Sequence, residues 1–354
     1  MNVSTGFPSA RVGGSKPRDW SDEVIYFPLT DRFCDGNPEN NHGVDRFDPL
    51  AFHGGDLAGI KQKLSEIQKT GSSTLWLAPV QKNTELGVIG DYRSAGYHGY
   101  WIQDHEQVDP HQGSLAEAKE LVKEAHSRGM RVVLDTVLNH TGPDHPWLQD
   151  PAKSEWFHHR GTIQDYNDQY QVERCDLGGL PDLNQENPEV YDYLLHNTAY
   201  WVKELNADGV RLDAVKHVSK DFWKKFVPDL KSELNNPELF VVGEVLHGDV
   251  GYVADYQRSG IDHLFDIPMY YTIREVLGND APCYELAKRF GEDWKYADPS
   301  KLVTLLDNHD FPRFMSTSQG SEELRVQRLE VALDLLMTMR GIPSLYYGTE
   351  SAME

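Results

Sequence analysis

The sequence predicts an α/β fold, a (β/α)8 or TIM barrel with an irregular subdomain inserted after its third strand. Eight short apolar runs alternate with helical patterns, which is typical of a parallel sheet. Polar residues follow several of these runs at the strand ends where such barrels carry their sites. Residues 141–186 break the alternation. We therefore expect barrel strands one to three in 1–140, the subdomain in 141–186 and the remaining strands in 187–354.

The individual elements follow from local patterns. Runs rich in apolar and β-branched residues predict strands at 23–33, 74–80, 131–138, from 208 in the stretch 208–217, and at 239–246, 263–267, 301–306 and 342–347. Apolar residues at helical spacing predict helices at 57–69, 115–127, 188–205, 221–234, within 270–277 and at 321–340. Gly71 and Gly129 end the first two helices. Residues 278–299 stay unassigned, and we expect the eighth outer helix to be missing from this chain.

Composition restricts the partners of the chain. The net charge of −22 disfavours nucleic acid and anionic membranes and suits a neutral substrate and cations such as calcium. No window of about 20 apolar residues predicts a membrane span. Residues 1–20 lack the apolar core of a signal peptide and read as a polar lead-in. Cys34, Cys175 and Cys283 are too scattered for a disulfide framework, so we expect one disulfide at most.

The stretch DGVRLDAVKH at 208–217 carries the first chemical signal. Arg211 and Asp213 lie two residues apart and would face the same side of a strand. The guanidinium would keep the carboxylate ionised, as covalent attack on a sugar carbon requires. A structural salt bridge would look the same in isolation. Other polar residues at predicted strand ends favour a site: Asp135, Asn139, His140, Glu244, His309 and Asp310. Glu244 lies in an apolar run, which favours a protonated acid.

These residues belong to motifs that resemble the α-amylase family of glycoside hydrolases, with some likeness to its cyclodextrin-forming members. The motifs are DTVLNH (135–140), GVRLDAVKH (209–217), GEV (243–245), DNHD (307–310), GGDL (54–57), LPDLN (180–184) and GIPSLYYGTE (341–350). Their order and spacing together are specific, and the resemblance covers nearly all of 24–350. It implies that an antiparallel β domain would follow the barrel, and none is present in this chain.

The resemblance also implies roles. Asp213 matches the nucleophile, Glu244 the general acid/base and Asp310 the carboxylate that stabilises the transition state. The implied substrate contacts are Arg211, which orients Asp213, His140 and His309 in the cleavage subsite, Tyr100 beneath the sugar, its neighbour Trp101, and Lys216 and His217 on the leaving-group side.

Two calcium sites are implied as well. The first would use Asn139, Asp182, Glu173 and the carbonyl of His217. The second would use Asp35, Asn37, Asn40, Asn41, Asp56 and the carbonyl of Gly54. For Glu173 the alternative is a structural role, and for the second loop it is an Asx-turn without metal.

The expected activity is retaining endo-hydrolysis of α-1,4 links in starch-like glucans by a secreted monomer, with a cytoplasmic location as the alternative. A transglycosylase is the competing enzyme, and a truncated sugar-binding barrel is the alternative of another class. Cyclodextrin-forming members carry an aromatic residue just before the LPDLN-like motif. This chain has Leu177 and Gly178 there, which favours hydrolysis.

Overall fold

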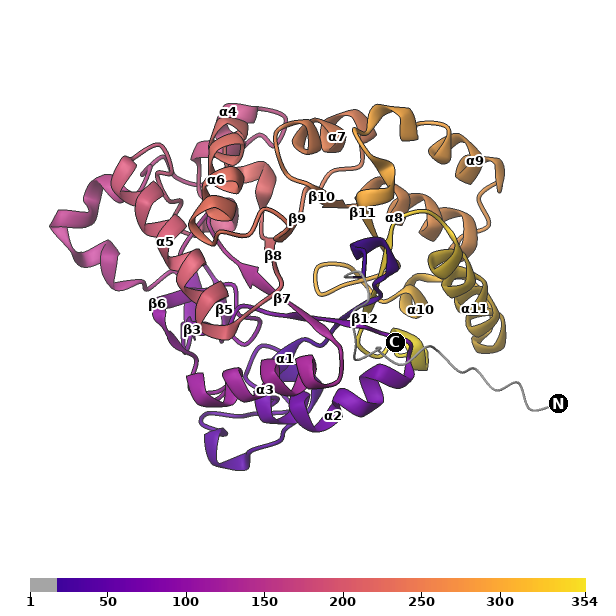
Figure 1. Ribbon diagram of the computed structural model, residues 1–354, viewed down its shortest axis with the longest axis horizontal. Helices are drawn as coiled ribbons and strands as arrows, with labels where there is room; N and C mark the ends of the chain where they lie inside the picture. Colours follow the sequence, from indigo (N-terminus) through magenta and orange to yellow (C-terminus); the bar gives the residue numbers. More distant parts are fainter. Residues whose placement is uncertain (1–17) are drawn as a thin grey trace.

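The computed structural model describes residues 18–354 and is built around a closed barrel of eight parallel strands (Figure 1). The strands, in chain order, are β1 (Ile25–Phe27), β2 (Thr74–Leu77), β7 (Arg131–Thr136), β8 (Gly209–Leu212), β9 (Phe240–Gly243), β10 (His263–Phe265), β11 (Leu302–Leu305) and β12 (Ile342–Tyr346). The ring closes where β1 pairs with β12. The predicted barrel is confirmed. The polar lead-in predicted for residues 1–17 lies outside the described residues.

Helices surround the barrel (Figure 1). They are α2 (Leu57–Lys69), α3 (Leu115–Ser127), α5 (Pro188–Leu205), α6 (Lys220–Glu233), α7 (Val250–Arg258), α8 (Ile267–Ile273) and α11 (Glu322–Thr338). Side chains cap the N-termini of the first two of these helices. At α2, Asp56 accepts a hydrogen bond from the amide of Gly59 at 2.6 Å, and at α3, Ser114 and Glu117 form a capping box. A 3-10 turn at Thr349–Ser351 follows β12.

Strand alternation decides which side chains reach the barrel interior. Along β7, Val132 and Leu134 pack against the outer helices, whereas Val133 packs with the residues that fill the barrel. Asp135 faces inward as well, because it lies two residues further along. The register pairs Asp135 with Arg211 of β8, so a carboxylate and a guanidinium meet inside the barrel.

The predicted strands all extend beyond the observed ones, and for two of them the structure shows why. The first ends at Phe27, and the chain turns into α1 (Thr30–Phe33), where Asp31 accepts the amides of His53 at 2.9 Å and Gly54 at 3.1 Å. These hydrogen bonds from amides more than 20 residues away favour the helical turn over the strand that the local sequence pattern predicts. The fourth ends at Leu212, since Ala214 adopts a left-handed conformation with φ 49° before a 3-10 turn at Val215–His217.

Other elements escaped prediction. They include α7, and α9 (Tyr284–Phe290) beyond a π-helical turn at Arg274–Gly278. Between β2 and α3 the chain also forms two antiparallel pairs, β3 (Gln81–Asn83) with β6 (Ile102–Val108) and β4 (Gly87–Ile89) with β5 (Tyr92–Ser94). β3 and β6 are rich in polar residues, which hides them in the sequence, whereas the Gly90-Asp91 pair between β4 and β5 is a hairpin signal that the prediction missed.

The segment 141–186 contains only short helices, of which α4 (Gln169–Arg174) is the one α-helix among them. An isolated bridge between His140 and Asp182 joins it to the residues that follow β7, whereas the bridge between Phe157 and Leu183 lies within the segment. The three cysteines are free, which settles the disulfide question left open by the sequence.

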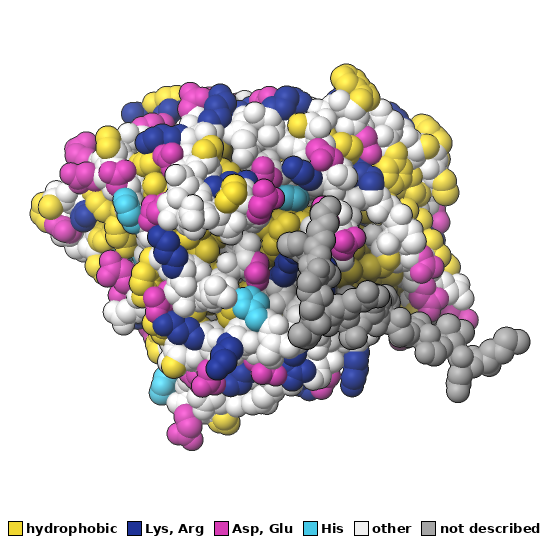
Figure 2. All heavy atoms as spheres, in the orientation of Figure 1, with side chains coloured by type: hydrophobic (Ala, Val, Ile, Leu, Met, Phe, Trp, Pro, Cys, Tyr) yellow, Lys and Arg dark blue, Asp and Glu magenta, His cyan; other side chains and the backbone are white. Residues whose placement is uncertain are grey.

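The surface carries both charges. Figure 2 shows acidic side chains interspersed with Lys and Arg over one face of the molecule. Within residues 18–354, no helix is both long and apolar enough to cross a membrane.

Candidate active site

The C-terminal ends of the barrel strands open into a cleft of about 650 Å³. Predicted residues that line it are Asp213, Glu244 and Asp310, together with Tyr100, His140, Lys216, His217 and His309. The volume lies within the usual range for small-ligand sites, about 300–1,000 Å³. The structure thus brings nearly all predicted catalytic and substrate-binding residues to one place.

Arg211 is the centre of the site. Its side chain is fully buried, and Nη1 donates to Oδ1 of Asp213 at 2.6 Å and to Oδ1 of Asp135 at 3.0 Å. Its Nη2 lies 3.5 Å from Oε2 of Glu244. One guanidinium therefore faces three carboxylates, and its positive charge offsets part of the repulsion among them.

Asp135 holds this guanidinium in place. Its Oδ2 accepts hydrogen bonds from the indole Nε1 of Trp76 at 2.9 Å and from the hydroxyl of Tyr100 at 2.7 Å. The sequence placed Asp135 at a strand end without giving it a role. Asp135 lies two residues after Val133 and therefore faces the barrel interior. Its contact with Arg211 can be recognised only when the pairing of β7 with β8 is known.

The environments of the acids differ. Burial raises the pKa of Asp213, and the Arg211 guanidinium opposes that rise. Glu244 follows β9 directly, and its Oε2 accepts the amide of Ala214 at 3.1 Å. Desolvation raises the pKa of Asp310, whose amide donates to Oδ1 of Asn308 at 2.8 Å. The three acids are therefore held by different groups within one cleft.

Two histidines reach the cleft in neutral form. Burial lowers the pKa of both His140 and His309 to about 4. His140 Nε2 lies 3.1 Å from the carbonyl of Tyr100, and the His309 ring stacks on the Tyr100 ring at 4.8 Å between centroids. A neutral imidazole has one donor and one acceptor, which suits hydrogen bonding to sugar hydroxyls.

The wall beyond β8 carries Lys216 and His217. Lys216 Nζ donates to the carbonyl of Leu246 at 2.9 Å, and burial lowers the lysine pKa. Tyr166, from the inserted segment, also lines the cleft and is 54% exposed. Its ring lies 5.8 Å from Lys216 Nζ. Tyr166 was not among the predicted site residues, because its only sequence signal is an aromatic side chain in a segment without apolar periodicity.

Trp101 does not line the cleft. It is buried, and its ring packs so closely on Gly87 of β4 that a Cβ there would lie 2.4 Å away. Its amide donates to Oδ1 of Asn83 at 2.7 Å. The structure therefore places Trp101 beneath the β4–β5 pair rather than against a ligand.

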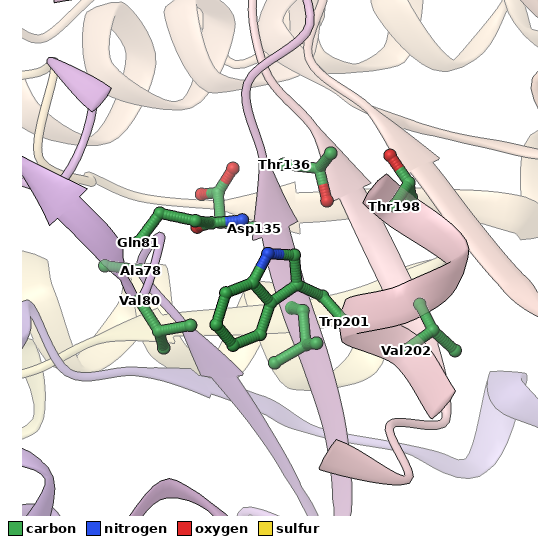
Figure 3. A pocket seen from close by; sticks show the side chains of 9 residues that line it. Ala78, Val80, Gln81, Asp135, Thr136, Thr198, Trp201 and Val202 are labelled. Atoms are coloured by element: carbon green, nitrogen blue, oxygen red, sulfur yellow. The ribbon is translucent and has the colours of Figure 1, made fainter. Parts of the chain in front are cut away.

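A second, much smaller cavity of about 10 Å³ lies between β7 and α5. Figure 3 shows Gln81 and Asp135 near one another beside it, with the indole of Trp201 across from them. This volume is about that of one water molecule and excludes a larger ligand. Of these two cavities, the cleft is the one with room for a substrate.

The first calcium candidate has converging oxygens. Asn139 Oδ1 faces Oδ1 of Asp182 at 3.2 Å and the carbonyl of His217 at 2.9 Å. Three facing oxygens suit a hard cation, whereas the reversed amide would donate to both neighbours. Burial raises the pKa of Asp182 to about 7, opposed by His158. Glu173 is engaged with Gln169 at 2.8 Å, within α4.

The second candidate fits in part. Asp35, Asn40 and Asn41 each bury a side-chain oxygen that has no hydrogen-bond partner among residues 18–354. Asn41 Oδ1 also abuts Gly54, where a Cβ would lie 2.4 Å away. The other two predicted side chains are engaged in hydrogen bonds to the backbone. The Asp56 carboxylate accepts hydrogen bonds from the amides of Gly36, Asn37 and Gly59, and Asn37 Oδ1 accepts one from the amide of Glu39.

Both candidates depend on amide and backbone oxygens as well as carboxylates. Within residues 18–354, no group of three or more His, Cys, Asp or Glu side chains is arranged to hold a metal. Mixed oxygen sets of this kind are typical of calcium rather than zinc.

Comparison with known proteins places this barrel and cleft in a family. The family model described as "Alpha amylase, catalytic domain" matches residues 27–354. The structure of an Anoxybacillus α-amylase is similar, with a TM-score of 0.87 and 45% identity over 95% of this chain and 73% of that one. The chain therefore belongs to the α-amylase family, whose members in these comparisons are named as amylases or as glucanotransferases.

Curated relatives include both kinds of enzyme. A β/α-amylase of Paenibacillus polymyxa is 38% identical over 94% of this chain, and a cyclomaltodextrin glucanotransferase of Klebsiella oxytoca is 32% identical over 98%. The chain spans 28% of the first relative and 61% of the second.

Proposed function

We propose that the protein hydrolyses internal α-1,4-glucosidic bonds of starch-like glucans with retention of configuration. The observation that supports this best is that Asp213 and Glu244 contact one buried guanidinium, that of Arg211, inside an open cleft. Retaining glycosidases need a nucleophile and an acid about 5–5.5 Å apart, and a shared guanidinium suits such a short separation.

In the proposed first step, a carboxylate oxygen of Asp213 attacks the anomeric carbon. Glu244 gives its proton to the glycosidic oxygen as the bond to the leaving sugar breaks. The product is a glycosyl ester on Asp213 and a free non-reducing hydroxyl on the leaving chain. Arg211 orients Asp213 in this step through the 2.6 Å hydrogen bond.

In the second step, Glu244 takes a proton from water as the water oxygen attacks the same anomeric carbon. The ester bond breaks, Asp213 leaves as a carboxylate and Glu244 regains its proton. Asp310, which contacts His309 and lines the cleft, would hydrogen-bond the sugar hydroxyls and offset the positive charge of the transition state.

Transglycosylation is the second candidate, and Tyr166 favours it. Leu177 and Leu180 line the cleft where cyclodextrin-forming members have an aromatic residue nearby, but the exposed Tyr166 ring offers another acceptor platform. An acceptor sugar held there would compete with water for the glycosyl ester. The similarity to cyclomaltodextrin glucanotransferases also supports this second candidate.

We further propose that calcium binds at one or both oxygen clusters. Asn139, Asp182 and the carbonyl of His217 would hold the first ion. Glu173, which is hydrogen-bonded to Gln169, would be the further ligand that the resemblance implies. Asp35, Asn40, Asn41 and Gly54 would hold the second. The ions would neutralise carboxylates and tie the inserted segment to the barrel.

A product profile from maltoheptaose, recorded with and without a calcium chelator, tests the function. Linear maltooligosaccharides of several lengths support endo-hydrolysis. Cyclic products would replace it with transglycosylation, and no turnover in the presence of calcium would refute both.

A further inference from the structure

A groove outside the catalytic cleft lies between α8 and α9, which pack side by side on the rim of the molecule (Figure 1). Its volume is about 460 Å³, within the usual range for small-ligand sites. Tyr271 forms one wall and is 37% exposed, and Val276, Ala281 and Pro282 supply an apolar floor. An exposed ring beside a small apolar floor suits a ligand with a flat apolar face.

The charges of the groove are paired. Arg289 Nη1 lies 2.8 Å from Glu292 and its Nε donates to Thr272, while Lys288 lies 3.5 Å from Glu285. Glu275, which also lines the groove, lies 3.7 Å from Arg274, so these ion pairs leave little net charge to attract an anion or a metal ion. They still present donors and acceptors, so a neutral ligand rich in hydroxyl groups fits the groove best.

Tyr271 connects this groove to the cleft in two ways. Its ring lies 6.0 Å from that of Phe311, the residue directly after Asp310. It also lies against Gly248, where an added Cβ would be 3.7 Å from the ring, in the loop that begins with the cleft residue Leu246. The groove therefore starts one loop away from the wall that carries Lys216.

We propose that the α8–α9 groove is a second glucan-binding site, in which Tyr271 stacks on a sugar ring and the paired charges bind its hydroxyls. It would take a stretch of the same long α-glucan whose scissile bond lies in the cleft, on the leaving-group side. This inference rests on the proposed function, because it takes the substrate of the cleft as the ligand. Long chains would gain affinity from the groove, and short oligosaccharides would not reach it.

The binding test uses the full chain with Glu244→Gln, so that substrate is bound but not consumed. Migration in native gels containing amylose gives apparent affinities for Tyr271→Ala and for the matched control Tyr284→Ala. Tyr284 is 63% exposed in α9 and does not line the groove. Loss of one aromatic contact predicts a fall in affinity of about two- to twelvefold for Tyr271→Ala and no change for Tyr284→Ala. Equal retardation of the two variants would overturn the proposal.

The same substitutions in the active chain separate this site from the proposed function. Tyr271→Ala should lower kcat/KM on amylose by the same factor while kcat/KM on a chromogenic maltotrioside is unchanged. An equal loss on both substrates would mean that Tyr271 acts on Asp310 through Phe311, which would refute the second site. A parent that hydrolyses neither substrate refutes the proposed function, whereas amylose binding through Tyr271 would survive that result.

Discussion

Replacing Arg211 with glutamine removes the positive charge that faces three carboxylates. Asp135, Asp213 and Glu244 lie 3.0, 2.6 and 3.5 Å from the guanidinium, whose side chain is fully buried. An opposite charge at such a distance lowers the pKa of an aspartate by about 1–3 units. Burial already raises the pKa of Asp213 and the Arg211 guanidinium opposes that rise, so Arg211→Gln should raise the pKa of Asp213 further. Breaking a buried ion pair also costs about 3–5 kcal/mol of folding stability.

The consequence for activity has a definite sign. Asp213 attacks only when ionised, so a higher pKa removes activity from the acid side of the pH profile. The acid limb of kcat/KM against pH should move up by about 1–3 units, with activity recovering as the pH rises. Hydrolysis of a chromogenic maltooligosaccharide from pH 4 to 9 measures the shift, and urea unfolding measures the loss of stability.

Arg211→Lys serves as the control because it keeps the positive charge and loses the forked geometry. Its acid limb should stay near that of the parent even where kcat falls. If the acid limb of Arg211→Gln coincides with that of the parent and kcat falls evenly at every pH, Arg211 positions the site without setting the ionisation of Asp213.

Two further predictions follow from the groups around this cluster. Trp76→Phe removes the indole donor to Asp135, and a hydrogen bond to a charged group contributes about 1.5–3 kcal/mol. Urea unfolding should show that loss of stability, and kcat should fall while KM stays the same. A change in KM alone would contradict the positioning role of Trp76. Removing calcium with a chelator should lower the Tm reversibly, since an ion at a hundred times its Kd adds about 2.7 kcal/mol of stability. Asn41→Ala should reduce this dependence of the Tm on calcium, because Asn41 belongs to the second proposed site. An identical dependence in the variant would rule that site out.

The barrel could be predicted because its strands are buried on both faces and read as continuous apolar runs. Val210 and Leu212 in β8 and Val241 and Val242 in β9 are all almost fully buried. Asp213 and Glu244 could be placed because each directly follows such a run, where a barrel positions its site. Local sequence therefore locates residues that the strand ends position.

What local sequence could not supply depends on distant contacts. The position of Asp135 beside Trp76 and Tyr100 is set by strand register and by a loop from another part of the chain. The burial of Trp101 depends on its close contact with Gly87, and the Gly-Asp turn of the β4–β5 hairpin does not reveal which distant ring packs against it. The helical turn at Thr30–Phe33 depends on backbone amides from residues 53 and 54.

The central claim is that Asp213 forms a covalent bond to the sugar while Glu244 handles the proton. Incubating Glu244→Gln with α-maltotriosyl fluoride tests it directly, because fluoride leaves without an acid and the missing base slows the release of the ester. Mass spectrometry should find one maltotriosyl unit on the peptide that contains Asp213, and none when Asp213→Asn is added. An unlabelled protein that releases a product of inverted configuration would contradict the account.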